Sequence, residues 1–218
     1  MTRAPRASLS ERRLYLCTPD RLDLGEFVTA CIEGGVDVVQ LREKHLEARP
    51  LLARAAVAAE VCRRQGVPFI VNDRPDLARA AGADGVHVGQ DDVPVRVVRE
   101  ILGPNAVVGL STHGPGDLAG AADEDIDYIS AGPVEPTPTK PGRPGTGLGY
   151  VTLASERSSV PVFVTGGVTP ERIPALAAAG ARHFVVVRSL TEAADPRAAA
   201  QALRTAIDLA WSTEPTAP

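Results

Sequence analysis

The amino-acid sequence predicts an α/β protein that folds as a single (β/α)8 TIM barrel. From Leu14 onward, short runs of β-branched residues alternate with Ala- and Leu-rich stretches, a pattern typical of parallel strands joined by crossover helices. The 218 residues, 44% of them hydrophobic, suffice for one such barrel. A doubly wound open sheet is the alternative, but it typically has five or six strands and often opens with a GxGxxG turn, which this chain lacks.

The elements can be placed in order along the chain. Eight strands are predicted at residues 14–18, 36–43, 68–73, 85–89, 106–112, 126–132, 161–167 and 183–189. The clearest helix is predicted at 195–211, where Asp195 suits the N-cap and Pro196 the first helical position. Residues 133–147 are rich in Pro and Gly and predict a long loop of the kind that often binds ligands. We expect residues 14–211 to form the barrel, with a flexible arm at 1–13 and a flexible tail at 212–218.

Composition excludes several classes of function. A net charge of -4 and a pI near 5.6 give no reason to expect nucleic acid as a partner, so an anionic ligand must be held by local charges. No apolar stretch suits a secretory signal or a membrane span, which predicts a soluble, cytoplasmic protein. Cys17, Cys31 and Cys62 form no CxxC pair and are expected to be buried, reduced thiols. The sequence leaves the oligomeric state open, including a homo-oligomer.

The second predicted strand carries the clearest candidate residues. Active sites of α/β barrels lie at the C-terminal ends of the strands, and side chains alternate along a strand. Gln40, Arg42 and Lys44 therefore share one face and can converge. An arginine, a lysine and an amide suit a diphosphate or triphosphate group, although a solvated charge pair at the strand end is the alternative.

The third and fourth predicted strands end in carboxylates. Asn72 and Asp73 end one strand, and Asp92 follows the next, so two carboxylates could reach one hard cation, for which Mg²⁺ is the natural candidate. Water and substrate phosphate oxygens would complete its coordination. In the alternative, Asp73 pairs with Arg74 and Asp92 caps the helix that begins near Val93.

Weaker signals follow at the later strand ends. Ser111 and His113 could contact phosphate or move a proton, although a helix N-cap explains a Ser or Thr there about as well. Two hydroxyls and a lysine stand at 137–140. Gly167 with its neighbours and Arg188 fit the phosphate site that barrels commonly build from their last two loops. His87 is interpreted as a hydrogen-bonded interior residue, and Trp211 as a packing residue.

Six motifs in order resemble the thiamine phosphate synthase family: VVQLREK at 38–44, VNDR at 71–74, ADGVHVGQDD at 83–92, GLSTH at 109–113, AGPVEPTPTK at 131–140 and TGG at 165–167. The resemblance covers about residues 14–190. It implies a transferase that joins 4-amino-5-hydroxymethyl-2-methylpyrimidine diphosphate to 4-methyl-5-(2-hydroxyethyl)thiazole phosphate, giving thiamine phosphate and pyrophosphate. The C–O bond is expected to break first, with the thiazole nitrogen capturing the resulting cation.

The resemblance also implies roles for individual residues. Those expected to act in catalysis are Lys140, Ser111, Arg42 and Lys44, and those expected to hold Mg²⁺ are Asp73 and Asp92. The residues expected to contact the substrates are Gln40, Leu41, Arg42, Glu43, Lys44, Asn72, Ser111, Thr137, Pro138, Thr139, Lys140, Gly167, Val187 and Arg188. The chain departs from the family's usual pattern at Thr165, His183 and Arg188.

Two other functions compete with this interpretation. A thiazole tautomerase shares the barrel and uses a histidine near the position of His113 as acid and base. Such relatives tend to lose the Gln of QLREK and the paired threonines of PTPTK, which are intact here. A non-catalytic barrel that binds a phosphate ligand is the second alternative, and loss of Asp73, Asp92 or Lys140 would have suggested it. None of the three is lost.

Overall fold

Eight short parallel strands pair in sequence order, and the last strand pairs with the first, which closes the sheet into a barrel. This computed structural model describes residues 9–137 and 144–212. The strands are β1 (Leu14–Thr18), β2 (Val38–Leu41), β3 (Phe69–Asn72), β4 (Gly85–Val88), β5 (Val107–Thr112), β6 (Tyr128–Ala131), β7 (Val162–Thr165) and β8 (His183–Val186). The predicted TIM barrel is confirmed, and the open sheet is excluded by the pairing of β1 with β8.

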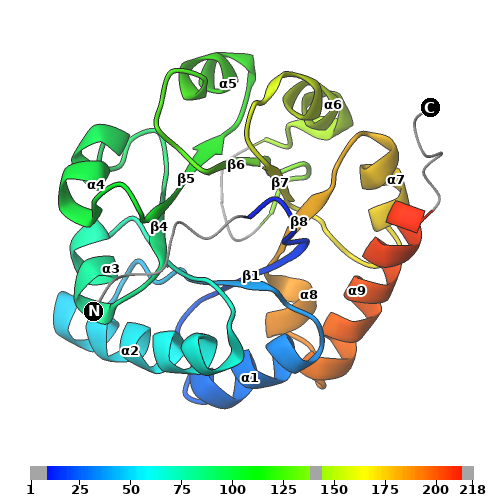
Figure 1. Cartoon of the computed structure of the whole chain (residues 1–218). Coiled ribbons are helices and arrows are strands. Elements are labelled where there is room, and N and C mark those ends of the chain that lie inside the picture. The colour runs from blue at the N-terminus through cyan, green and yellow to red at the C-terminus, as the bar shows by residue number, and fades with distance from the viewer. Residues whose placement is uncertain (1–8, 138–143, 213–218) are drawn as a thin grey trace.

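Helices surround the barrel on its outer side (Figure 1). They are α1 (Leu24–Glu33), α2 (Ala48–Gln65), α3 (Pro75–Ala81), α4 (Val95–Leu102), α5 (Pro115–Ala121), α6 (Gly147–Arg157), α7 (Ile173–Ala178), α8 (Arg188–Thr191) and α9 (Pro196–Ser212). The final helix begins as predicted, because the Ala198 amide donates to Asp195 Oδ1 at 3.0 Å. No helix in the described ranges is long and apolar enough to cross a membrane.

Several strands are shorter than the sequence predicts. Carboxylates at the N-terminal ends of β2, β4 and β6 join these strands to their neighbours. Asp37, Asp84 and Asp127 each stand just before a strand and accept a backbone amide of the preceding strand. The distances are 2.9 Å to Leu14 N, 2.8 Å to Phe69 N and 2.7 Å to Val108 N. Each of these aspartates also donates its own backbone amide to the same residue of the neighbouring strand, so side chain and backbone together join adjacent strands where the barrel begins.

The interior divides into two apolar layers. The larger lies between the strands and the helices, and the smaller fills the barrel with Tyr15, Tyr128, Phe163 and their neighbours. The ring centroids of Tyr128 and Phe163 lie 5.2 Å apart in an edge-to-face arrangement. Leu9 belongs to this inner layer and is buried, so the segment that the sequence assigns to a flexible arm contacts the barrel from residue 9 onward.

The cysteines and Trp211 are placed as predicted. Cys17, Cys31 and Cys62 are all buried and free. Burial raises the pKa of the Cys31 and Cys62 thiols to about 12 each, so both stay protonated at neutral pH. Trp211 packs against the outer apolar layer and accepts the Arg13 guanidinium over its ring, 3.8 Å from the centroid.

We predict that Gly85→Ala lowers the free energy of unfolding by about 1–3 kcal/mol, because the new Cβ would overlap the Val107 carbonyl where β4 meets β5. Gly116→Ala is the matched control, since nothing lies within 4 Å of a Cβ there. It should change stability by less than about 0.5 kcal/mol. Urea denaturation followed by circular dichroism measures both, and equal stability of the two variants would contradict the packing argument.

Candidate active site

A cavity of about 600 Å³ opens at the C-terminal ends of the strands. That size suits a small-molecule ligand. It is lined by most of the residues that the sequence and the resemblance single out, namely Gln40, Arg42, Lys44, Asn72, Asp73, Asp92, Ser111, Thr137, Gly167, Val187 and Arg188. Three further expected residues, Pro138, Thr139 and Lys140, lie outside the described residues.

Strand β2 points alternate side chains into the cavity. Gln40 is buried at its wall, and Arg42 and Lys44 follow it toward the opening. Leu41 and Glu43, which were expected to contact substrate, do not line the cavity. The side chain of Leu41 lies in the apolar layer beneath the helices, and Glu43 Oε1 accepts the backbone amide of His45 at 2.7 Å. The period of two along a strand explains why both point away.

Lys44, Asp73 and Asp92 form a charged cluster from three neighbouring strand ends. Lys44 Nζ lies 2.8 Å from Asp73 Oδ2, and the carboxyl groups of Asp73 and Asp92 share a hydrogen bond. Asp92 Oδ2 also accepts the Gly89 amide at 2.8 Å. Both alternatives from the sequence are wrong, since Arg74 pairs with Asp76 and α4 begins only at Val95, after an N-cap at Pro94.

The two carboxyl groups titrate differently. Burial raises the pKa of Asp73, and the Asp92 carboxylate adds to this effect while Lys44 opposes it. Burial also acts to raise the pKa of Asp92, but hydrogen bonds from Gly89 and Asp73, with Lys44 nearby, outweigh it and hold that pKa below its usual value. Two carboxyl groups within hydrogen-bond distance of each other are expected where a bound cation would offset their negative charge.

Asp73 also has an uncommon backbone conformation. Its φ of 59° places it in the left-handed region, where it stands alone among the non-glycine residues of the described segments. Aspartate and asparagine tolerate this region better than most residues, but strained backbone of this kind tends to persist where function requires it. The left-handed conformation therefore marks Asp73 as a candidate functional residue.

The end of β5 does not cap a helix, as the alternative for Ser111 and Thr112 required. The N-cap of α5 is Gly114, and Thr112 Oγ1 donates to the Ser130 carbonyl at 3.0 Å. Ser111 is buried and lines the cavity. His113 also lines it, with its Nδ1 hydrogen-bonded to the Gly132 carbonyl.

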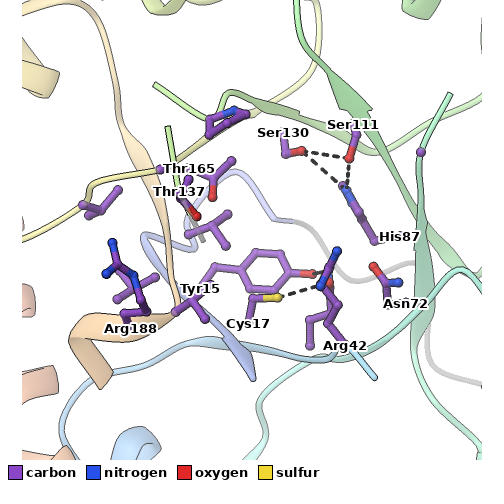
Figure 2. A pocket seen from close by; sticks show the side chains of 18 of the residues that line it. Tyr15, Cys17, Arg42, Asn72, His87, Ser111, Ser130, Thr137, Thr165 and Arg188 are labelled. Carbon is purple, nitrogen blue, oxygen red and sulfur yellow. Dashed lines mark hydrogen bonds between the residues drawn. The ribbon is translucent and has the colours of Figure 1, made fainter. Parts of the chain in front are cut away.

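The opposite wall is built from the loops after β7 and β8. Gly166 and Gly167 have φ values of 94° and 75°, which glycine adopts readily, and a Cβ at Gly167 would overlap the Arg172 and Glu135 side chains. Arg188 begins α8 and lines the cavity. Figure 2 shows Arg188 across the cavity from Asn72 and His87, with Tyr15 between them.

The floor of the cavity was not predicted from the sequence; it is formed by Tyr15, Cys17, Tyr128 and Ser130. His87 completes this floor, and its interpretation as a hydrogen-bonded interior residue is confirmed by contacts with Tyr128 and Ser111. All five side chains project inward from strands. Applying the alternation of strand residues to β1, β4 and β6 as well as β2 would have found them.

Asn72 carries a buried donor that no described residue pairs with. Its side chain is 5% exposed and lines the cavity, and its Nδ2 has no hydrogen-bond partner among the described residues. A buried amide left without a partner costs about 1–3 kcal/mol. Because this donor lies at the cavity wall, a ligand acceptor can pair with it.

We predict that Asp73→Asn raises the urea midpoint of the protein at pH 7 in the presence of EDTA. A folded-state pKa above the unfolded value means that charged Asp73 destabilises the fold, and this cost is absent below the unfolded pKa. Asparagine keeps the shape and tolerates the same φ. The gain should therefore shrink as pH falls through the raised pKa toward about 4. A variant that is less stable than wild type at pH 7 would contradict the prediction.

Comparison with known proteins identifies the family. The family model described as thiamine monophosphate synthase matches residues 14–190. A thiamine-phosphate synthase of Mycobacterium bovis (strain BCG / Pasteur 1173P2) is 49% identical over 216 residues, covering 93% of this chain and 97% of its own. One from Thermobifida fusca (strain YX) is 50% identical over 205 residues, covering 91% and 94%. The solved structure of a thiamine phosphate pyrophosphorylase from Pyrococcus furiosus superposes with a TM-score of 0.83 at 30% identity, covering 91% and 96%. The chain therefore belongs to the thiamine monophosphate synthase family and is a transferase.

Proposed function

We propose that the enzyme joins 4-amino-5-hydroxymethyl-2-methylpyrimidine diphosphate to 4-methyl-5-(2-hydroxyethyl)thiazole phosphate, with thiamine phosphate and pyrophosphate as products. The observation that carries the proposal is the two-sided cavity. Arg42, Lys44 and two carboxylates stand on one side, and a glycine-lined loop with Arg188 stands on the other. Two separate anion sites suit two substrates that each carry phosphate.

The diphosphate belongs on the side of β2 to β5. Arg42 can hold two phosphate oxygens at once, and the ammonium of Lys44 has further donors besides the one that faces Asp73. Asn72 offers its unsatisfied amide on the same side. The resemblance adds Lys140, with Thr137 and Thr139 toward the thiazole phosphate. Of these three, only Thr137 is among the described residues, and it lines the cavity.

Mg²⁺ fits the donor set at Asp73 and Asp92. The described residues contain no group of three or more His, Cys, Asp or Glu that could hold a metal, so these two carboxylates would be its protein ligands. Mg²⁺ commonly binds through one or two carboxylates and completes its shell with water and phosphate oxygens. When bound, it would supply electrostatic stabilisation of the diphosphate.

In the proposed reaction the methylene C–O bond of the pyrimidine breaks, and the bonding electrons leave with pyrophosphate. The thiazole nitrogen then donates its lone pair to the methylene cation and forms the new C–N bond. Neither step needs a strong general base. Arg42 and Lys44 assist because fixed cations stabilise the charge that develops on the leaving group.

The cellular location remains part of the proposal. The three buried free thiols agree with a reducing compartment, and we place the enzyme in the cytoplasm on that basis.

We expect purified protein to release pyrophosphate only when both substrates and Mg²⁺ are present. A coupled assay for pyrophosphate, with each substrate or the metal omitted in turn, measures this directly. No product from well-folded protein would remove the synthase proposal. Isomerisation of a thiazole carboxylate phosphate under the same conditions would instead favour the tautomerase, and binding of either substrate without turnover would favour the non-catalytic barrel.

Because the two sides of the cavity are proposed to bind different groups, a variant on each side should change a different kinetic quantity. Arg188→Ala should raise the KM for the thiazole phosphate about tenfold and leave the KM for the pyrimidine diphosphate nearly unchanged, because one charge-assisted contact is lost on one side only. Asp92→Asn should raise the Mg²⁺ concentration needed for half-maximal rate. Steady-state kinetics with each component varied checks both. An equal effect of either variant on both substrates would mean that the two sites are misplaced.

A further inference from the structure

A continuous line of buried hydrogen bonds crosses the floor of the cavity. Gln40 Nε2 lies 2.8 Å from the Tyr15 hydroxyl, which lies 2.9 Å from the Tyr128 hydroxyl. The Tyr128 hydroxyl lies 3.0 Å from His87 Nδ1, and His87 Nε2 lies 2.9 Å from Ser111 Oγ. Five side chains from β1, β2, β4, β5 and β6 thus form one chain, and Figure 2 labels Tyr15, His87 and Ser111 along it.

The direction of donation along this line is set at Gln40. Cys17 Sγ lies 3.4 Å from Gln40 Oε1, and a thiol donates to a carbonyl oxygen more readily than it accepts from an amide. The amide nitrogen of Gln40 therefore faces Tyr15 and donates to its oxygen. The Tyr15 hydroxyl then has its own proton to donate, and the Tyr128 oxygen, 2.9 Å away, is the acceptor toward which we direct it.

The hydroxyl groups of Tyr15 and Tyr128 both stay protonated, so each can accept one hydrogen bond and donate another. Burial raises the pKa of Tyr15 and of Tyr128 far above the ordinary value. Tyr128 accepts from Tyr15 and donates to His87 Nδ1. An imidazole nitrogen that accepts a hydrogen bond carries no proton, and the ring proton of the neutral tautomer therefore stands on Nε2.

Ser111 stands at the far end of the line. Its Oγ accepts from His87 Nε2 at 2.9 Å and from Ser130 Oγ at 3.4 Å. With both acceptor positions used, the Ser111 hydroxyl has its own proton left to donate. Ser111 lines the cavity, and the ligand that occupies the cavity provides the acceptor.

We propose that His87 is a positioning residue: the Tyr15–Tyr128 pair holds its proton on Nε2, and His87 thereby turns the Ser111 hydroxyl proton toward an oxygen of the bound diphosphate substrate. This inference rests on the proposed function, since it deepens the role of Ser111 in that reaction. A hydroxyl that is already aimed needs no reorganisation when charge develops on the leaving group, which is the condition under which a donor assists most.

The first test is the tautomer itself. Long-range ¹H–¹⁵N NMR of the ¹⁵N-labelled enzyme near neutral pH distinguishes a protonated Nε2 from a protonated Nδ1. The chain has four histidines, so the His87 signals are assigned by their loss in His87→Gln. We expect protonated Nε2 and bare Nδ1 in wild type. A protonated Nδ1 would reverse the direction of the line and overturn the proposal, whether or not the enzyme makes thiamine phosphate.

The second test asks whether this line of hydrogen bonds affects catalysis through Ser111. Tyr128→Phe removes the hydroxyl and keeps the ring, and we expect it to mix the His87 tautomers and to lower kcat/KM about five- to tenfold, the typical effect of one hydrogen bond. In the Ser111→Ala background the same change should cost less than about twofold, because residues in one network are not additive. Tyr15→Phe interrupts the same line of hydrogen bonds one residue earlier, and it replaces Tyr128→Phe in this test if that variant does not fold.

Thr29→Val is the control, because Thr29 lies on α1 outside the cavity lining and its hydroxyl donates to the Gly25 carbonyl at 2.8 Å. It should leave both the His87 signals and kcat/KM unchanged. If Tyr128→Phe lowers kcat/KM equally with and without Ser111, the hydroxyl acts structurally and the proposal fails. Pyrophosphate release by wild type in the same assay shows separately whether the proposed function holds.

Discussion

Closure of the sheet by the pairing of β1 with β8 is the constraint on which the site depends. In a closed parallel barrel every strand ends at the same mouth, and alternate residues of each strand face one interior. Residues distant in sequence are thereby brought within hydrogen-bond distance: Tyr15 and Tyr128 stand 113 positions apart, yet their hydroxyls lie 2.9 Å apart. The apolar side chains fill the lower interior, and the polar ones form the floor and walls of the cavity above.

The charge of the site is local and does not follow from the charge of the chain. A protein with net charge -4 has no long-range attraction for phosphate. The cationic side chains at the mouth of the barrel must therefore bind phosphate through direct contacts. Lys44 forms an ion pair with Asp73, and the carboxyl group of Asp73 shares a hydrogen bond with that of Asp92. This arrangement is costly for the metal-free protein, since the burial of Asp73 opposes its ionisation. The cost is understandable if the cluster is shaped for a bound cation and an anionic substrate.

Much of the fold and part of the site could be predicted, because they follow from the repeating pattern of apolar residues and from which residues stand at the strand ends. Eight β-branched runs predict eight strands, and the alternation along β2 correctly placed Gln40, Arg42 and Lys44 together. The exact strand bounds could not be predicted, because they depend on which backbone groups pair across strands and not on the period along one strand. The ion pair of Asp73 was misjudged for the same reason: its partner Lys44 comes from another strand, whereas the sequence offers Arg74 next to it.

The floor shows what a buried polar layer requires. Polar groups out of contact with water are stabilising only when each has its partner, and from Cys17 to Ser130 the donors and acceptors match in order. Asn72 Nδ2 breaks the pattern, and it lies at the same wall as His87, its partner in the β3–β4 register. Because the groups of this network are paired with one another, none of them is left to accept a hydrogen bond from Asn72 Nδ2. The unsatisfied amide and the spare proton of Ser111 are therefore both left for a ligand, and a cavity built this way is preorganised before substrate enters.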